Sequence, residues 1–122
     1  MPSPSSVAVA LLQLNPVVGD LDGNVRLIAR AARDAHARGA VVAVAPELAL
    51  CGYPPEDLLF RPAFLAANER ALAALAAELA DLPGLHLVVG HPQAVPVPDV
   101  GTRSQALQRC VNAASVLNAG QV

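Results

Sequence analysis

Residues 44–64 read Val-Ala-Pro-Glu-Leu-Ala-Leu-Cys-Gly-Tyr-Pro-Pro-Glu-Asp-Leu-Leu-Phe-Arg-Pro-Ala-Phe. The apolar run at residues 41–45 predicts a short buried strand, and Pro46 and Glu47 follow where that strand should leave a sheet. A rigid strand can aim a carboxylate while the loop after it admits a substrate. Glu47 is therefore the candidate catalytic residue. A plain loop carboxylate or a helix cap is the alternative that the spacing leaves open.

The chain before this stretch predicts a strand–helix–strand unit. Residues 7–14 form a nearly continuous apolar run, which is typical of a strand covered on both faces. Asn24 is suited to cap a helix that runs to about Arg38, and Gly39 is suited to end it. Together with the strand at 41–45, the short loops imply parallel strands joined by a right-handed crossover. We therefore expect an α/β fold.

The chain after this stretch predicts further helices and strands and one long loop. The predicted helix has apolar residues at helical spacing, and the predicted strands are continuous apolar runs. The apolar residues of the loop follow no regular spacing. These segments are a helical turn that begins at Glu56 and Asp57, a helix at 63–79, strands at 85–90 and 110–117, the loop at 93–108, and a hairpin turn at 118–120. The sequence stops at Val122, where a return strand would begin. Because an unpaired last strand is unusual, we expect the N-terminal part of a larger protein.

The composition of the 122 residues argues against several functional classes. A net charge of −2 gives no electrostatic reason to expect nucleic acid or an anionic membrane as a partner. No apolar run is long enough to span a bilayer, and the N-terminus has no basic signal region. Two cysteines do not suggest a disulfide framework, so we expect a cytoplasmic protein. All eight basic residues are arginine, so this chain supplies no catalytic lysine.

Three parts of the chain together resemble one known family. They are Ala-Leu-Leu-Gln-Leu-Asn-Pro-Val-Val-Gly-Asp at 10–20 with Asn24, Pro-Glu at 46–47 with Gly-Tyr-Pro-Pro-Glu-Asp-Leu at 52–58, and Val-Gly-His-Pro at 89–92 with Val-Asn-Ala-Ala-Ser-Val at 111–116. They are similar to segments found in members of the nitrilase, or carbon–nitrogen hydrolase, superfamily. Pro-Glu after a strand is shared by its members generally. The extension at 52–58 resembles the glutaminase domains of glutamine-dependent NAD synthetases.

The resemblance implies a fold and a catalytic scheme. The fold is an α-β-β-α sandwich, here partial and truncated, and the active site is a Glu-Lys-Cys triad that hydrolyses the side-chain amide of L-glutamine. Glu47 matches the general base, while a thiolate attacks the amide and a lysine stabilises the anionic intermediate. The family's lysine and nucleophile would follow the turn at 118–120 and are therefore missing. Tyr53 is expected to line the glutamine pocket or the ammonia channel.

The resemblance also implies partners. The ammonia would pass to a synthetase domain of the same parent chain, which uses ATP and magnesium to convert deamido-NAD to NAD. The glutaminase domain needs no cofactor of its own, and we expect no metal site in this chain. We further expect a homo-oligomer, a disordered N-terminus at residues 1–6, and an incomplete glutaminase domain at residues 7–122. A truncated sandwich exposes the face meant for its second sheet, so the isolated chain should be poorly soluble or self-associate.

Two other functions remain open on the sequence. The chain is either part of another nitrilase-family amidase, against which the segment at 52–58 argues, or a non-catalytic remnant or binding module, which the missing lysine supports. Cys51 lies four residues after Glu47, and we interpret it, like Cys110, as a small buried residue rather than the nucleophile. We expect the isolated chain to have no glutaminase activity.

Overall fold

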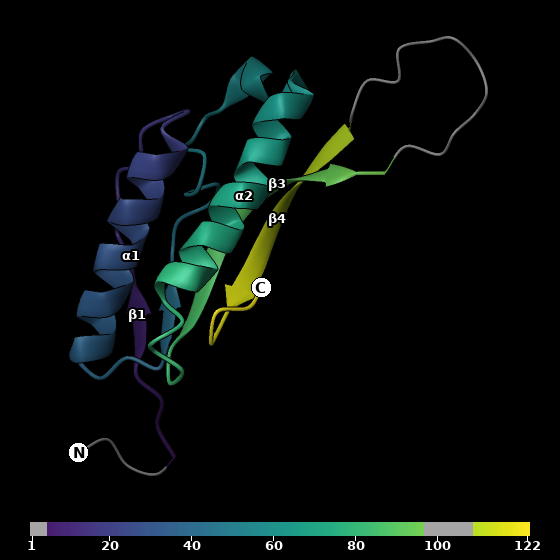
Figure 1. The fold of residues 1–122 in the computed structure, drawn as a ribbon. Helices are drawn as coiled ribbons and strands as arrows, with labels where there is room; N and C mark the ends of the chain where they lie inside the picture. The colour runs from purple at the N-terminus through teal and green to yellow at the C-terminus, as the bar shows by residue number, and fades with distance from the viewer. Residues whose placement is uncertain (1–4, 97–108) are drawn as a thin grey trace, which may run out of the picture.

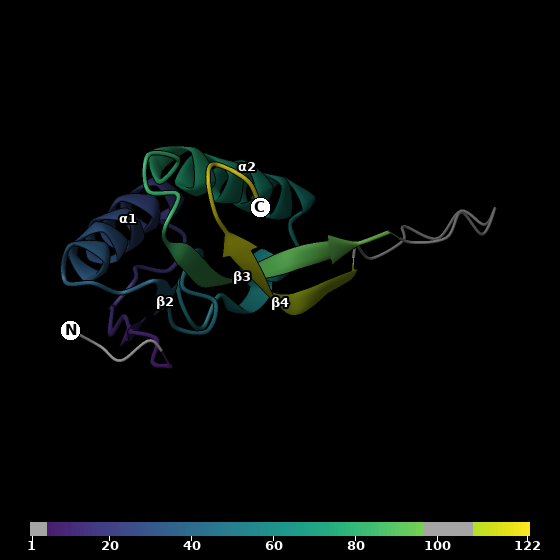
Figure 2. The same cartoon turned by 90° about the horizontal axis from the view of Figure 1, so that it is seen from below.

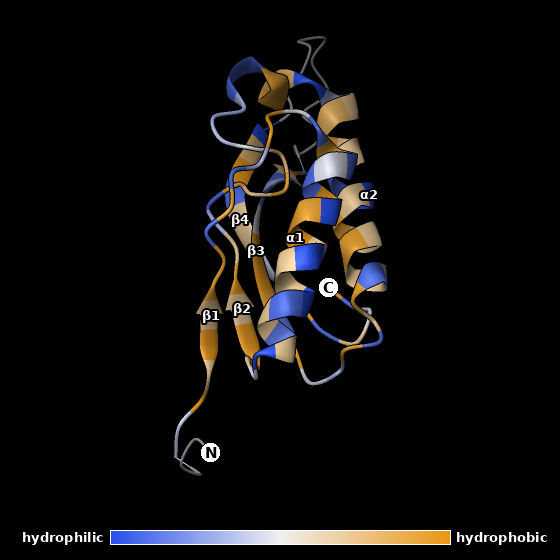
Figure 3. Cartoon of the chain, turned by 90° about the vertical axis from the view of Figure 1, so that its left-hand side faces the viewer, coloured by the Kyte–Doolittle hydropathy of each residue, from blue (hydrophilic) through white to orange (hydrophobic). Residues whose placement is uncertain are grey.

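Two helices cover one face of a four-stranded sheet in the computed structural model, which describes residues 5–96 and 109–122 (Figure 1). The elements follow one another as β1 (Val9–Leu11), α1 (Leu21–Ala37), β2 (Val42–Val44), the 3₁₀ helix η1 (Glu56–Phe60), α2 (Pro62–Glu78), β3 (His86–Val95) and β4 (Arg109–Leu117). Figures 2 and 3 show the helices in one layer and the strands in the other. The predicted α/β fold is confirmed.

The sheet has the strand order β1-β2-β3-β4. Strands β1, β2 and β3 run parallel, as the strand–helix–strand pattern predicts, and β4 runs antiparallel to β3. β3 continues to Val95, so the prediction of a loop from Gln93 was wrong at its start. The reason is a long-range partner: β4 pairs with β3 as far as Val95 and Arg109. The remainder of the predicted loop, 97–108, lies outside the described residues.

Helix α1 begins earlier than the sequence predicts. The residue that caps it is Asp20, whose Oδ1 accepts a hydrogen bond from the Gly23 backbone N–H at 3.0 Å. The assignment of the cap to Asn24 was wrong, because Asn24 lies inside the helix and is 2% exposed. Its side chain bonds to two loops instead of to the helix end.

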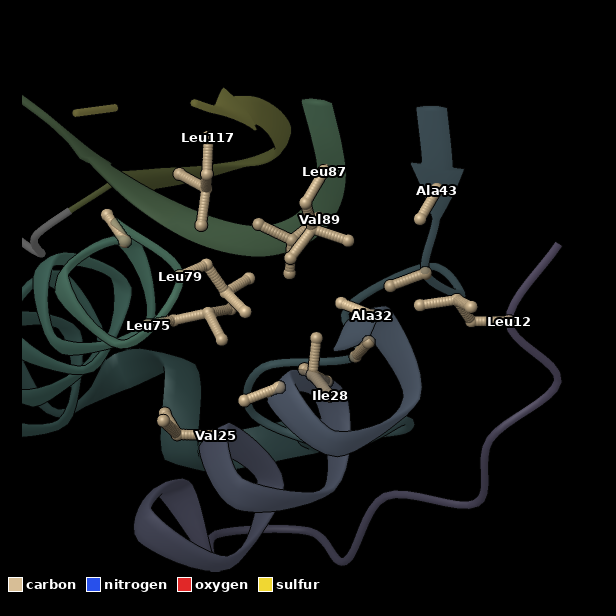
Figure 4. Packing of buried hydrophobic residues seen from close by; sticks show 14 of the residues in the cluster. Leu12, Val25, Ile28, Ala32, Ala43, Leu75, Leu79, Leu87, Val89 and Leu117 are labelled. Atoms are coloured by element: carbon tan, nitrogen blue, oxygen red, sulfur yellow. The ribbon is translucent and has the colours of Figure 1, made fainter. Parts of the chain in front are cut away.

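The core lies between the helices and one face of the sheet (Figure 4). The larger buried side chains include Ile28 from α1, Leu75 from α2, and Leu87 and Val89 from β3. Alanines fill much of the remaining contact, which lets α1 approach the short strand β2 closely. Burying each leucine or isoleucine stabilises the fold by about 1.5–3 kcal/mol, so this small set of residues carries much of the stability of a chain with few aromatic residues.

The opposite face of the sheet carries an apolar row that no described helix covers. Leu11 pairs with Val44, Val44 with Val88, and Val88 with Val116, so the row crosses all four strands. At its two ends Leu11 is 74% exposed and Val116 is 52% exposed. Because strand side chains alternate between faces, this row lies opposite the helices. Its exposure agrees with the expectation that one face of the sheet is left open.

We predict that the isolated chain self-associates through this row. Replacing Leu11→Gln and Val116→Thr should shift the chain towards the 12.5 kDa monomer in size-exclusion chromatography with light scattering, because the exposed apolar area falls. Phe60→Gln is the matched control, since Phe60 is 68% exposed but lies in η1, outside the row. A wild-type chain that is monomeric and melts in one sharp cooperative transition would contradict this prediction.

Candidate functional site

Glu47 lies at the carboxyl end of β2, as the sequence predicts. The strand ends at Val44, and residues 47–51 form a tight turn in which Leu48 has a positive φ of 51°. The Glu47 side chain is exposed. Its Oε1 accepts a hydrogen bond from Nδ2 of Asn112 on β4 at 2.5 Å. The carboxylate is therefore held at one oxygen and still open to solvent.

The backbone around Glu47 rests directly against Gly90 of β3. A Cβ atom at position 90 would lie 2.6 Å from the Leu48 backbone nitrogen and 3.1 Å from the Pro46 carbonyl oxygen. The Leu50 backbone N–H also donates to the Gly90 carbonyl at 3.2 Å. Any side chain at this position would push the turn away from the sheet. The glycine thus fixes where the Glu47 backbone sits.

Asn24 joins the same turn to the loop before α1. Its Nδ2 donates to the carbonyl oxygens of Val17 at 2.8 Å and Leu50 at 3.0 Å, and its Oδ1 accepts from the Val17 N–H at 2.9 Å. All three hydrogen bonds belong to a side chain that is almost fully buried. Since a buried amide is costly to leave unpaired, this residue ties the two loops together.

Gly52 completes the contact between the two loops. It has a positive φ of 82°, and a Cβ there would lie 2.6 Å from the Val18 backbone. One residue earlier, the Cys51 carbonyl accepts from the Gly19 N–H at 2.9 Å. The turn that carries Glu47 is therefore packed on its other side by the backbone of the loop before α1.

Cys51 does not have the properties of a nucleophile. Its side chain is fully buried, and its sulfur lies 3.6 Å from the Leu48 carbonyl oxygen and 3.4 Å from that of Gly52. Burial raises the pKa of the Cys51 thiol to about 11. A thiol of this kind is protonated near neutral pH, whereas attack on an amide needs a thiolate. The interpretation of Cys51 as a small buried residue is confirmed, but the same interpretation of Cys110 was wrong, because Cys110 is only partly buried.

Two other residues, Tyr53 after the Glu47 turn and His91 within β3, differ in their surroundings. Tyr53 follows the Glu47 turn and is 65% exposed, so its ring is available to a ligand, and its role in binding stays a prediction. His91 is 5% exposed, and its Nε2 lies 2.7 Å from the Ser115 Oγ. That hydrogen bond joins β3 to β4 inside the protein and gives His91 a structural partner.

Other kinds of site are not evident in the described ranges. Residues 5–96 and 109–122 contain no group of three or more His, Cys, Asp or Glu side chains that is arranged to hold a metal ion. A hollow of about 450 Å³ lies between α1 and α2, but none of its lining residues belongs to the Glu47 turn. Neither helix in the described part of the chain combines the length and apolar character of a membrane span.

The sequence alone did not indicate the contacts through which Asn24 and Asn112 hold this site together. Asn112 interrupts an apolar run that forms β4, and Asn24 lies on the face of α1 that also carries Val25 and Ile28. A polar residue in an apolar pattern is a signal that its side chain has a specific partner. The partner itself could not be identified, because the bond from Asn112 to Glu47 spans 65 residues.

Comparisons of the sequence with known proteins point to one family. The family model for carbon-nitrogen hydrolases matches residues 8–121. A glutamine-dependent NAD(+) synthetase from Synechocystis sp. is 39% identical over 93% of this chain and 19% of its own length. One from Xylella fastidiosa is 44% identical over 93% of this chain and 18% of its own length. The chain thus spans about a fifth of the length of the curated relatives it matches.

Solved structures agree with this result. A glutamine-dependent NAD+ synthetase from Acinetobacter baumannii, in complex with ADP, superimposes with a TM-score of 0.71 at 31% identity, over 93% of this chain and 19% of that one. An amidase from Nesterenkonia sp. matches with a TM-score of 0.58 at 27% identity, over 70% of this chain and 32% of that one. Since the family model covers nearly the whole sequence, this chain belongs to the carbon–nitrogen hydrolase family.

Proposed function

We propose that this chain is part of a glutamine-hydrolysing domain that supplies ammonia for NAD synthesis, and that Glu47 is its general base. One observation carries the proposal: an exposed carboxylate stands at the carboxyl end of β2 and is fixed by a hydrogen bond from another strand. The choice of glutamine and NAD rests on the names of the relatives, which are glutamine-dependent NAD(+) synthetases.

The proposed role of Glu47 is to move a proton. A carboxylate can accept the proton of a cysteine thiol as its sulfur attacks the amide carbon, and can return it to the nitrogen that leaves as ammonia. The arrangement suits this role because one oxygen is anchored by Asn112 while the side chain remains exposed. Tyr53, which is exposed beyond the turn, is the proposed contact for the glutamine or the ammonia.

The other two members of the triad would come from outside residues 1–122. The chain has no lysine, and the buried thiol of Cys51 is unsuited to attack. The relatives are about five times as long as this chain, which leaves ample sequence for a lysine, a nucleophile and a synthetase domain. That domain would bind ATP and magnesium, and the whole protein would act as a cytoplasmic homo-oligomer. In this proposal residues 7–122 are the N-terminal portion of the glutaminase domain; residues 1–4 of the predicted N-terminal segment lie outside the described residues.

The structure of an amidase favours a second candidate function. The Nesterenkonia amidase shares the fold, so a parent protein that hydrolyses other amides without making NAD is the main alternative. The higher sequence identity of the NAD synthetase relatives, 39% and 44% against 27% for the amidase, favours the first candidate. A non-catalytic binding module is the third candidate, and it predicts that no variant of Glu47 changes an amidase activity.

In the longer protein encoded by the parent reading frame, Glu47→Gln should lower the rate of ammonia release from glutamine by about 100- to 10,000-fold, the usual contribution of a general base. NAD formation from added ammonium should continue, because that route bypasses glutamine hydrolysis. Glu69→Gln is the matched control, since Glu69 is an exposed carboxylate in α2, outside the segment at 52–58, and should leave both rates unchanged.

Each other result of this experiment has a defined meaning. Full glutamine hydrolysis by the Glu47→Gln variant would sink the general-base assignment. Hydrolysis of simple amides without any NAD formation by the wild type would favour the amidase alternative. Absence of both activities in a folded wild-type parent would favour the binding module.

The isolated 122-residue chain should release no ammonia from glutamine, because it contains Glu47 but neither a lysine nor an exposed low-pKa thiol close to it. A coupled ammonia assay with refolded, concentrated chain tests this prediction. Steady release that disappears in Glu47→Gln would show that the triad interpretation is wrong.

The two cysteines should differ in reactivity. Cys51 is buried with a pKa of about 11, so it should resist a thiol reagent such as iodoacetamide at pH 7–8, whereas the partly exposed Cys110 should react first. Mass spectrometry of peptides from the labelled chain distinguishes the sites, and the urea-unfolded chain is the control in which both should react. Equal labelling of both cysteines in the folded chain would contradict the burial of Cys51.

A further inference from the structure

We propose that Asn112 is a positioning residue for the catalytic carboxylate. This inference rests on the proposed function, in which Glu47 is the general base. Its evidence is the hydrogen bond that Nδ2 of Asn112 donates to Oε1 of Glu47 at 2.5 Å. The two residues come from β4 and from the turn after β2, so the contact exists only in the folded sheet.

Asn112 is placed by a long antiparallel ladder. The pairing of β3 with β4 runs without a break from Leu87 and Leu117 to Val95 and Arg109, and Asn112 stands opposite Pro92 within it. Alternation along β4 puts Asn112 on the same face as Ala114 and Val116. The amide therefore projects from a rigid strand rather than from a loop.

The backbone around Glu47 is anchored to β3, the strand with which β4 pairs. Ala114, two residues from Asn112, pairs with Gly90, and Gly90 is the residue against which the backbone of Pro46–Leu48 rests. The donor on Asn112 and the acceptor on Glu47 are thus both positioned by the same short segment of β3, Gly90–Pro92. A hydrogen bond between two groups held in this way orders a side chain that is otherwise free to rotate in solvent.

The chemistry of an amide suits this task. The carboxamide of Asn112 donates to a single carboxylate oxygen, so the second oxygen of Glu47 remains available to a thiol proton. An amide also carries no charge, so it orients the carboxylate without forming an ion pair with it. A lysine at this place would both orient and neutralise the base, and an aspartate would repel it.

The test uses the parent protein with glutamine or ammonium as the nitrogen source. Asn112→Ala should lower kcat for glutamine hydrolysis by about 10- to 100-fold, the cost of a misplaced catalytic group, with KM changed by less than about twofold. NAD formation from ammonium should be unchanged. Val111→Ala is the matched control: Val111 precedes Asn112 in β4, is 50% exposed, and should leave kcat unchanged.

Asn112→Asp provides a second variant in case the alanine variant does not fold. It keeps the size of the side chain but offers no donor at neutral pH, so its loss in kcat should be at least as large. If Glu47→Gln abolishes hydrolysis while both Asn112 variants keep the wild-type kcat, the inference is wrong and the proposed function stands. If Glu47→Gln is itself active, the proposed function fails. Equal loss of the glutamine and ammonium rates would assign Asn112 a purely structural role and overturn the inference.

Discussion

The close approach of the Pro46–Leu48 backbone to Gly90 is the constraint on which the candidate site depends. With a Cβ at position 90 only 2.6 Å from the Leu48 nitrogen, the turn could not lie where it does. β3 also pairs with β2 on one side and with β4 on the other. The position of each neighbour along the sheet is therefore set by its pairing with β3. The absence of a side chain at Gly90 therefore lets Glu47, which follows β2, come within hydrogen-bond distance of Asn112 on β4.

The loop packing on the far side of the turn reinforces this constraint. Asn24 bonds to the carbonyls of Val17 and Leu50, and the backbone of Val18 closes against Gly52. The turn is thus held between a glycine of the sheet and an amide of α1. Since buried polar groups are costly to leave unpaired, breaking the hydrogen bonds of Asn24 would destabilise the packing of the two loops. Such a double anchor limits the motion of Glu47 without contacting its carboxylate.

Local sequence patterns were enough to predict the elements and the place of Glu47 after β2, but not the contacts that connect them. Apolar runs and glycine or proline breaks indicated the parallel strands, both helices and the turn at 118–120, where Asn118 and Gln121 form a bridge. The cap of α1 and the end of β3 were misplaced. The cap of α1 is a local contact, because Asp20 accepts from the Gly23 N–H, whereas Asn24 bonds to Val17 and to the more distant Leu50. The end of β3 depends on β4, a partner that is distant in sequence. Periodicity carries no information about such partners.

The charges of the described residues bear on how the site would work. The described salt bridges, Arg33 with Asp81 and Arg38 with Asp34, lie on exposed helix surfaces and their ends. The described partner of Glu47, in contrast, is the neutral amide of Asn112. A carboxylate that is oriented but not neutralised can still attract a cation, and in the proposed scheme a lysine from the longer protein would stand beside it. The described residues therefore orient this carboxylate through a neutral donor and leave its charge available to the lysine of the proposed scheme.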